Sequence, residues 1–194
     1  MISVDLRSLL GRLDRTCATA LQNAAGLAVS RGHFEVAVEH FFVKLLEAGD
    51  SDFSLILAAK GVDRGGLLQA VQAALEDFRA GHSGKPVFSP LLTDLVQDAW
   101  MVASIDLGCR QVRSGAVLLA FLARPALYVT GRYGAAFEGL GREAVAKEFA
   151  ALTRGSAAAE ALQEVWTPEL VVRASDGGPL SLGRVSVVAL ADPG

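Results

Sequence analysis

Apolar residues recur at helical spacing over roughly the first 155 positions of the chain, which predicts a sequence of short amphipathic helices. A first helix carries an apolar stripe of Leu6, Leu9, Leu10 and Leu13. Asp14 is placed to cap a second helix, and Gly32 can take the left-handed conformation that ends it. The predicted inward face of that second helix comprises Cys17, Leu21, Ala24, Ala25 and Ala28.

Three more helices are predicted before residue 79. They begin near Val38, Phe53 and Arg64, and glycine-containing breaks separate them. Residues 79–87 form a polar, glycine-bearing connection. The sequence Phe88-Ser89-Pro90 then predicts a new helix, because Ser89 can accept hydrogen bonds from free N–H groups and Pro90 presets the backbone of the first turn.

The two halves of the helical region repeat each other at an offset of 75 residues. Asp14 aligns with Ser89 as the cap, and after a one-residue insertion the segment from Val36 aligns with the segment from Val112. Two such units would each leave an apolar face incompletely covered, so we expect them to pack about a pseudo-two-fold axis. The predicted fold class is therefore all-α, with an extra helix at residues 1–13, repeats at 14–78 and 88–160, and a linker at 79–87.

The remaining residues, 161–194, have a different pattern. Two β-branched segments, Glu169–Arg173 and Arg184–Leu190, flank Asp176-Gly177-Gly178-Pro179 and read as two short strands of a hairpin. An isolated hairpin is marginally stable in water, so we expect this β-prone tail of unknown role either to pack on the helices or to stay partly disordered.

Composition excludes several classes of function. The formal net charge is −3, and the eighteen Lys and Arg residues form no basic run, so we expect neither a nucleic-acid partner nor an anionic membrane. The longest apolar run, 116–123, is too short to cross a bilayer. With two distant cysteines and no apparent signal peptide, the chain is expected to be cytoplasmic.

Candidate catalytic and metal-binding residues are few. His33, Glu35, Glu39 and His40 resemble a metal-binding cluster, but the two histidines are seven apart across a helix boundary, so a packed structural His40 is the favoured interpretation. Cys17 lies on an inward helix face, where a free thiol behaves as a small hydrophobe. We therefore expect no catalytic residue, no metal and no cofactor.

Several segments together resemble the Clp N-domain family. These are Arg31-Gly32-His33-Phe34-Glu35-Val36-Ala37-Val38-Glu39-His40, then Lys44-Leu45-Leu46-Glu47, Phe88-Ser89-Pro90-Leu91-Leu92, Asp98-Ala99-Trp100 and Val112-Arg113-Ser114-Gly115. Together with the extra first helix they are most similar to the ClpV branch, whose members disassemble the contracted sheath of bacterial type VI secretion. The resemblance covers about residues 1–160 and implies a non-catalytic docking domain.

The resemblance also implies a partner, the N-terminal helix of the larger sheath subunit, called VipB or TssC. Members of that branch continue into AAA+ ATPase modules, whose phosphate loop needs a Gly-x-x-x-x-Gly-Lys-Ser/Thr sequence. The segment 81–86 lacks that spacing, so we expect no ATPase activity from this chain. Whether the chain is a fragment or a stand-alone paralogue stays open, as does its oligomeric state.

The predicted recognition mode is an amphipathic helix in an apolar groove. The candidate groove residues are Leu13, Ala20, Leu21, Ala24 and Phe88. Phe88 has a second interpretation, a hydrophobic staple that packs on Leu92 or Thr93 of the following helix. The alternative function is a stand-alone regulatory or structural protein that binds a partner through its strand tail.

Overall fold

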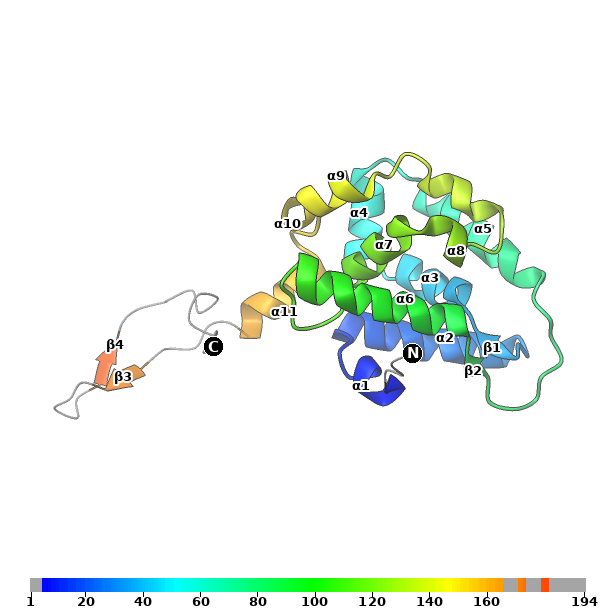
Figure 1. Ribbon diagram of the computed structural model, residues 1–194, viewed down its shortest axis with the longest axis horizontal. Coiled ribbons are helices and arrows are strands. Elements are labelled where there is room, and N and C mark those ends of the chain that lie inside the picture. Colours follow the sequence, from blue (N-terminus) through cyan, green and yellow to red (C-terminus); the bar gives the residue numbers. More distant parts are fainter. Residues whose placement is uncertain (1–4, 166–170, 174–178, 182–194) are drawn as a thin grey trace. The chain divides into compact units, whose positions relative to one another are not determined.

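Two units make up the chain, Met1–Ala158 and Ala159–Gly194, and each is considered by itself. The computed structural model describes residues 5–165, 171–173 and 179–181. In the first unit the helices surround one apolar core (Figure 1). No helix in the described part of the chain is both long enough and apolar enough to span a membrane.

The first repeat and the helix before it follow the predicted order. Their elements are α1 (Leu6–Leu10), α2 (Arg15–Ser30), β1 (Glu35–Val36), α3 (Val38–Glu47), α4 (Asp52–Ala59) and α5 (Arg64–Glu76). Gly32 follows α2 with a φ of 65°, as the sequence predicted. Leu13 was expected to extend the first helix, but α1 ends earlier because Leu13 forms a parallel β-bridge with Val112.

The second repeat is more broken. It contains β2 (Val87–Phe88), α6 (Pro90–Met101), the π-helical turn η1 (Val102–Asp106), α7 (Ser114–Ala123), α8 (Pro125–Tyr128), the 3-10 helix η2 (Arg132–Phe137), α9 (Arg142–Lys147) and α10 (Phe149–Leu152). The last helix is α11 (Ala157–Val165). Val87, predicted as the end of the linker, instead belongs to a strand.

Equivalent side chains cap the leading helix of each repeat. The Asp14 carboxylate accepts the Cys17 N–H at 2.7 Å, and the Ser89 hydroxyl accepts the Leu92 N–H at 3.1 Å. In both cases the donor lies three residues after the cap, which satisfies one of the free N–H groups of the first turn. The structure thus confirms the two caps that anchored the repeat alignment.

Short parallel pairings join the repeats reciprocally. Val36 pairs with Phe88 in the β1–β2 sheet, and Leu13 pairs with Val112. Leu13 and Phe88 occupy equivalent positions before α2 and α6, and Val36 and Val112 occupy equivalent positions before α3 and α7. Each repeat therefore contributes the same two segments to the other, as a pseudo-two-fold relation requires.

The core is assembled from both repeats. The Phe42 ring lies 5.1 Å from the Phe53 ring and 5.0 Å from the Phe121 ring, and Phe121 lies 4.6 Å from Phe137. Phe42, Phe53 and Phe121 are completely buried, and every residue of α7 from Gly115 to Leu122 is buried. α7 is consequently the central helix of this unit, which explains why its sequence shows almost no polar face.

The second unit contains an antiparallel pair, β3 (Val171–Arg173) and β4 (Pro179–Ser181). A hairpin was predicted here, but with Pro179 in the turn; instead Pro179 pairs with Arg173 and begins the second strand. Proline is tolerated at the first residue of a strand, so its presence did not exclude this start. The other predicted strand, Arg184–Leu190, lies outside the described residues.

Candidate peptide-binding site

The five predicted groove residues belong to one neighbourhood of the core. Leu13 precedes α2, and Ala20, Leu21 and Ala24 lie on one face of α2. Phe88 is held by β2, where the Ser89 N–H donates to the Val36 carbonyl at 3.0 Å. All five contribute to the same hydrophobic core or pack against it.

Their burial requires a correction to the predicted groove. Leu13, Ala20, Leu21 and Ala24 are between 0% and 6% exposed, and only Phe88 is half-buried. Ala20, Leu21 and Ala24 face inward on the apolar stripe with which α2 packs on α3, and Leu13 is buried just before α2, where it pairs with Val112. These four side chains are therefore not accessible to a peptide in this structure. They belong to the core that underlies the neighbouring surface.

More accessible apolar side chains lie on neighbouring elements. Leu6 of α1 is 36% exposed, and Leu10 of α1 and Leu91 of α6 are half-buried against the core. α1 contacts α6, and both α1 and the β1–β2 pair lie along the lower edge of the first unit in Figure 1. We call Leu6, Leu10, Phe88 and Leu91 the α1–β2 surface. Two sequence features could have indicated this surface: the amphipathic pattern of α1 and the helix cap before α6.

An aromatic and a charged side chain meet just after the end of α1. The Arg12 guanidinium lies 5.1 Å from the centroid of the Trp100 ring on α6. A cation over an indole face is attractive, so this contact helps to hold the end of α1 against α6. Sequence patterns did not reveal the contact, because the two residues are far apart along the chain.

No nucleophile is activated near these residues. Cys17 is fully buried, and burial raises the pKa of its thiol well above the ordinary value. Burial also raises the pKa of Asp14, although the Cys17 N–H bond opposes that shift. A thiol that stays protonated is neither a good nucleophile nor a metal ligand, so the environment of Cys17 fits the packing role expected for it.

His33 and His40 form a buried pair. The Nδ1 atom of His40 accepts the Ala37 N–H at 3.0 Å, in place of a side-chain cap for α3. Its Nε2 lies 2.8 Å from Nδ1 of His33 and must donate there, since His40 Nδ1 is already an acceptor. His40 is thus a packed structural residue, as expected. The described residues contain no group of three or more potential metal ligands.

Glu39 lies in the first turn of α3 but is only 1% exposed. Its carboxylate accepts hydrogen bonds from the hydroxyls of Tyr133, at 2.8 Å, and Thr130. These bonds tie η2 to α3. A buried carboxylate with two donors is a structural connection between the repeats.

Several known proteins are similar to this chain in sequence and in structure. The profile of the Clp repeat (R) N-terminal domain family matches residues 12–130. The N-domain of ClpV from Vibrio cholerae is similar at 35% identity and a TM-score of 0.76, over 81% of this chain and 94% of that one. A complex of a ClpV N-domain with a VipB peptide is similar at 35% identity and a TM-score of 0.74, over 81% of this chain and 96% of that one.

Among curated proteins, the AAA+ ATPase ClpV1 of Pseudomonas aeruginosa is 27% identical over 127 residues, which are 66% of this chain. The matched region is only 14% of the length of that relative. The profile match, the helical architecture and the similar solved domains agree with the resemblance found in the sequence. The chain belongs to the Clp repeat N-terminal domain family, and its structure is similar to the N-domains of ClpV ATPases.

Proposed function

We propose that this chain is the substrate-docking domain of a ClpV-type AAA+ unfoldase. Its ligand would be the N-terminal amphipathic helix of the large type VI secretion sheath subunit, VipB or TssC. Docking would deliver the sheath for disassembly and recycling, in the cytoplasm, and the chain itself would perform no chemistry. ATP-dependent steps would belong to the other modules of such an unfoldase.

One observation carries the proposal. The half-buried ring of Phe88 lies at the junction of the repeats, on a domain that is 35% identical to one solved with a VipB peptide. A further similar structure, at 29% identity, includes a peptide of the SciI protein of a type VI system. Both relatives support a peptide ligand, although neither assigns residues in this chain.

The α1–β2 surface suits a helix that inserts a few apolar side chains. Two or three apolar anchor side chains would each contribute about 1.5–3 kcal/mol to the binding free energy when buried. After the entropic cost of ordering the peptide is subtracted, a micromolar dissociation constant is expected. Leu13, Ala20, Leu21 and Ala24 would form the floor beneath the helix. Modest affinity at one domain suits a ring-shaped motor, because several linked domains gain strength by avidity and each can still release.

The test is titration of the full chain with a synthetic peptide of the sheath subunit's N-terminal helix, followed by fluorescence anisotropy. We expect Phe88→Glu to weaken binding at least tenfold, since a charge would replace an apolar anchor, while circular dichroism shows a folded domain. Val87→Glu is the matched control, because adjacent strand residues point to opposite faces and Val87 is already 63% exposed. Undiminished binding by a folded Phe88→Glu chain would refute the assignment.

The β3–β4 pair leaves a second candidate, a protein that binds its partner through the strand tail. Deletion of residues 165–194 separates the two functions. Under the docking proposal the truncated chain binds the sheath peptide normally. Under the alternative, recovery of the physiological partner would be lost with the tail while Phe88→Glu has no effect.

A further inference from the structure

Arg12 connects the segment after α1 to the last turn of α6. Its guanidinium lies 5.1 Å from the centroid of the Trp100 ring. Within the described residues Arg12 forms no ion pair, so the indole is the contact that orients this guanidinium. The Arg12 carbonyl accepts the Val112 N–H at 2.7 Å, which anchors the backbone at the same point.

The repeat fold does not require this contact. At the offset of 75 residues, Arg12 aligns with Val87 and Trp100 aligns with Ala25, and neither counterpart can form a cation–π contact. α1 has no helical counterpart either, because residues 80–85, which precede β2, form no helix. The Arg12–Trp100 contact therefore serves the placement of α1 rather than the packing of the repeats.

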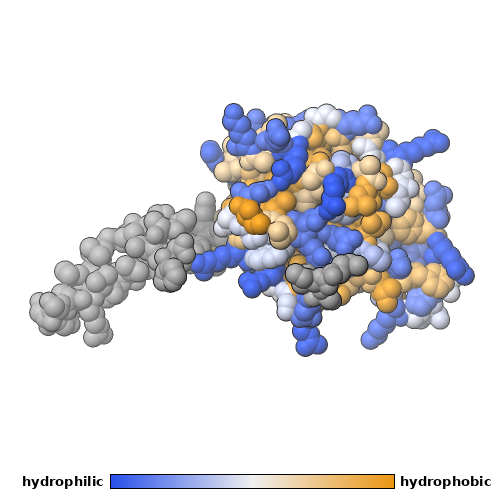
Figure 2. Space-filling model, viewed as in Figure 1, coloured by the Kyte–Doolittle hydropathy of each residue, from blue (hydrophilic) through white to orange (hydrophobic). Residues whose placement is uncertain are grey.

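α1 is held by few other contacts. It has only five residues, and a helix of that length is not stable by itself in water. Leu9 is buried at 3% exposure, whereas Leu6, Arg7 and Ser8 are exposed. Figure 2 shows hydrophilic residues on the lower edge of the first unit, where Figure 1 places α1. Loss of a single contact should therefore populate a state in which α1 is detached.

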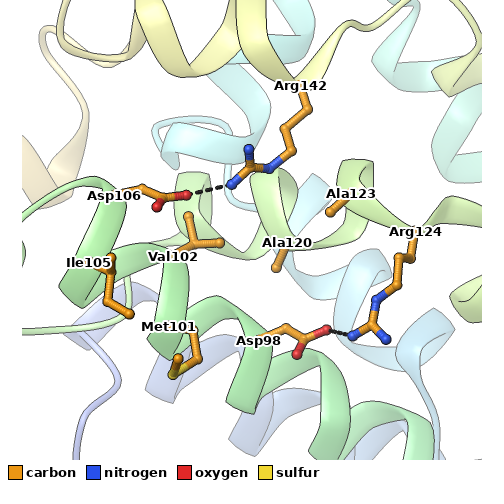
Figure 3. Close-up of a pocket in the computed structure, with 9 residues that line it drawn as sticks. All are labelled: Asp98, Met101, Val102, Ile105, Asp106, Ala120, Ala123, Arg124 and Arg142. Carbon is orange, nitrogen blue, oxygen red and sulfur yellow. Dashed lines mark hydrogen bonds and ion pairs between the residues drawn. The ribbon is translucent and has the colours of Figure 1, made fainter.

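The end of α6 is held more firmly. α6 contributes four buried residues to the core. Figure 3 shows that Asp98 of α6 pairs with Arg124, which precedes α8, and that Asp106 of η1 pairs with Arg142 of α9. Trp100 consequently stands on a fixed support, and α1 is the element that can move relative to it.

We propose that Arg12 is a positioning residue for peptide binding. Its contact with Trp100 keeps α1 against α6, so that Leu6 and Leu10 already belong to the α1–β2 surface before the peptide arrives. Arg12 acts through α1 and does not contact the peptide. This inference rests on the proposed function, because the α1–β2 surface is the peptide site that Arg12 preorganises. Molecules with a detached α1 do not bind, so the apparent affinity falls with the fraction that remains competent.

The test measures the association and dissociation rates of the labelled sheath peptide with the full chain by stopped-flow anisotropy. A cation–π contact at an exposed site changes an equilibrium by about two- to fivefold. We expect Arg12→Gln to lower the association rate constant by about that factor. The dissociation rate constant should stay nearly unchanged, because the bound peptide itself holds α1 in place.

Matched variants separate this effect from a change in charge. Arg12→Lys should restore most of the association rate, since an ammonium group is also attracted to an indole face. Trp100→Leu should slow association as Arg12→Gln does, and the two substitutions together should do no more than either alone. Arg15→Gln is the charge control, because Arg15 is exposed on α2 and its loss removes the same charge without affecting the Arg12–Trp100 contact.

Hydrogen exchange of the chain without peptide provides a second measurement. The Leu9 N–H donates to the Asp5 carbonyl at 3.0 Å, and this bond is lost when a detached α1 unfolds. In Arg12→Gln the Leu9 amide should exchange about two- to fivefold faster, while the amides of α7 keep their rates. Faster exchange throughout the first unit would instead show a general loss of stability and would overturn the positioning role.

The peptide measurements distinguish failure of this inference from failure of the proposed function. If Arg12→Gln associates as fast as the unmodified chain while Phe88→Glu weakens binding, the positioning role is wrong and the docking proposal stands. A faster dissociation with unchanged association would mean that Arg12 contacts the peptide directly, which also overturns the role. If the unmodified chain does not bind, or a folded Phe88→Glu chain binds normally, the proposed function fails and the positioning role fails with it.

Discussion

Arg113 and Asp52 form a buried, two-pronged ion pair between the repeats. Arg113 Nε donates to Oδ2 of Asp52 at 2.9 Å, and Nη2 donates to Oδ1 at 2.8 Å. Asp52 is completely buried, and Arg113 is 9% exposed. The pair joins the start of α4 in the first repeat to the residue before α7 in the second, so it fixes how the repeats meet.

Removing one partner of this pair should be costly. Arg113→Ala leaves the Asp52 carboxylate buried without its cation, and such breaks typically cost about 3–5 kcal/mol. We expect the free energy of unfolding, measured by urea denaturation, to fall by about 3 kcal/mol or more. Lys60→Gln is the control, since the Lys60–Glu148 pair is more exposed and its loss should change stability far less. If the two variants lost the same free energy of unfolding, burial would not determine how much the Arg113–Asp52 pair contributes to stability.

A second prediction concerns Gly115, at the start of α7. A Cβ atom there would lie 2.5 Å from Cε2 of Phe149 and 3.0 Å from Cβ of Asp52. Helix propensity alone favours Gly→Ala by about 1 kcal/mol, but overpacking of this size costs about 1–3 kcal/mol. We expect Gly115→Ala to lower the melting temperature despite its better propensity.

Gly26 provides the matched comparison within the same chain. It lies inside α2, and a Cβ atom there would meet nothing within 4 Å. Gly26→Ala should therefore raise stability by about 0.5–1 kcal/mol. The two substitutions are chemically identical, so opposite signs in calorimetry would isolate the steric effect. A stabilised Gly115→Ala chain would mean that Phe149 can move aside freely.

Local patterns explain why most of the first unit could be predicted from sequence. Asp14, Ser89, Pro90 and Gly32 mark helix ends through interactions within a few residues, and such signals survive without knowledge of the partners. The two-residue strands β1 and β2 have no detectable alternation, because a period of two needs a longer run. Their pairing is set by the other repeat.

The site was harder to predict for a related reason. The small apolar side chains of α2 have the composition of either a core face or a groove, and only packing against α3 shows that Ala20, Leu21 and Ala24 are core. The Glu39–Tyr133 bond joins residues 94 positions apart. Such long-range contacts cannot be recognised from local sequence patterns. Neither the burial of the predicted groove residues nor the Glu39–Tyr133 hydrogen bond could therefore be derived from the sequence.

The His33–His40 pair predicts how stability depends on pH. Burial, and then the neighbouring His33, lowers the pKa of His40 from 6.5 to about 4, and burial together with Arg31 lowers the pKa of His33. Burial is the main cause, since it disfavours the charged form of each ring. In addition, both Nδ1 atoms act as acceptors, so a proton on either would displace a hydrogen bond. Below the ordinary histidine pKa, the unfolded chain therefore binds more protons than the folded one. The free energy of unfolding consequently decreases as the pH is lowered.

For His40 alone, the free energy of unfolding should drop by about 2 kcal/mol between about pH 6.5 and about pH 4.5. Urea denaturation at several pH values measures this slope. His40→Gln should flatten it over that window, since glutamine can still accept the Ala37 N–H but does not titrate. If the His40→Gln chain loses stability as steeply as the unmodified one, carboxylates account for the acid sensitivity and the buried histidine pair does not.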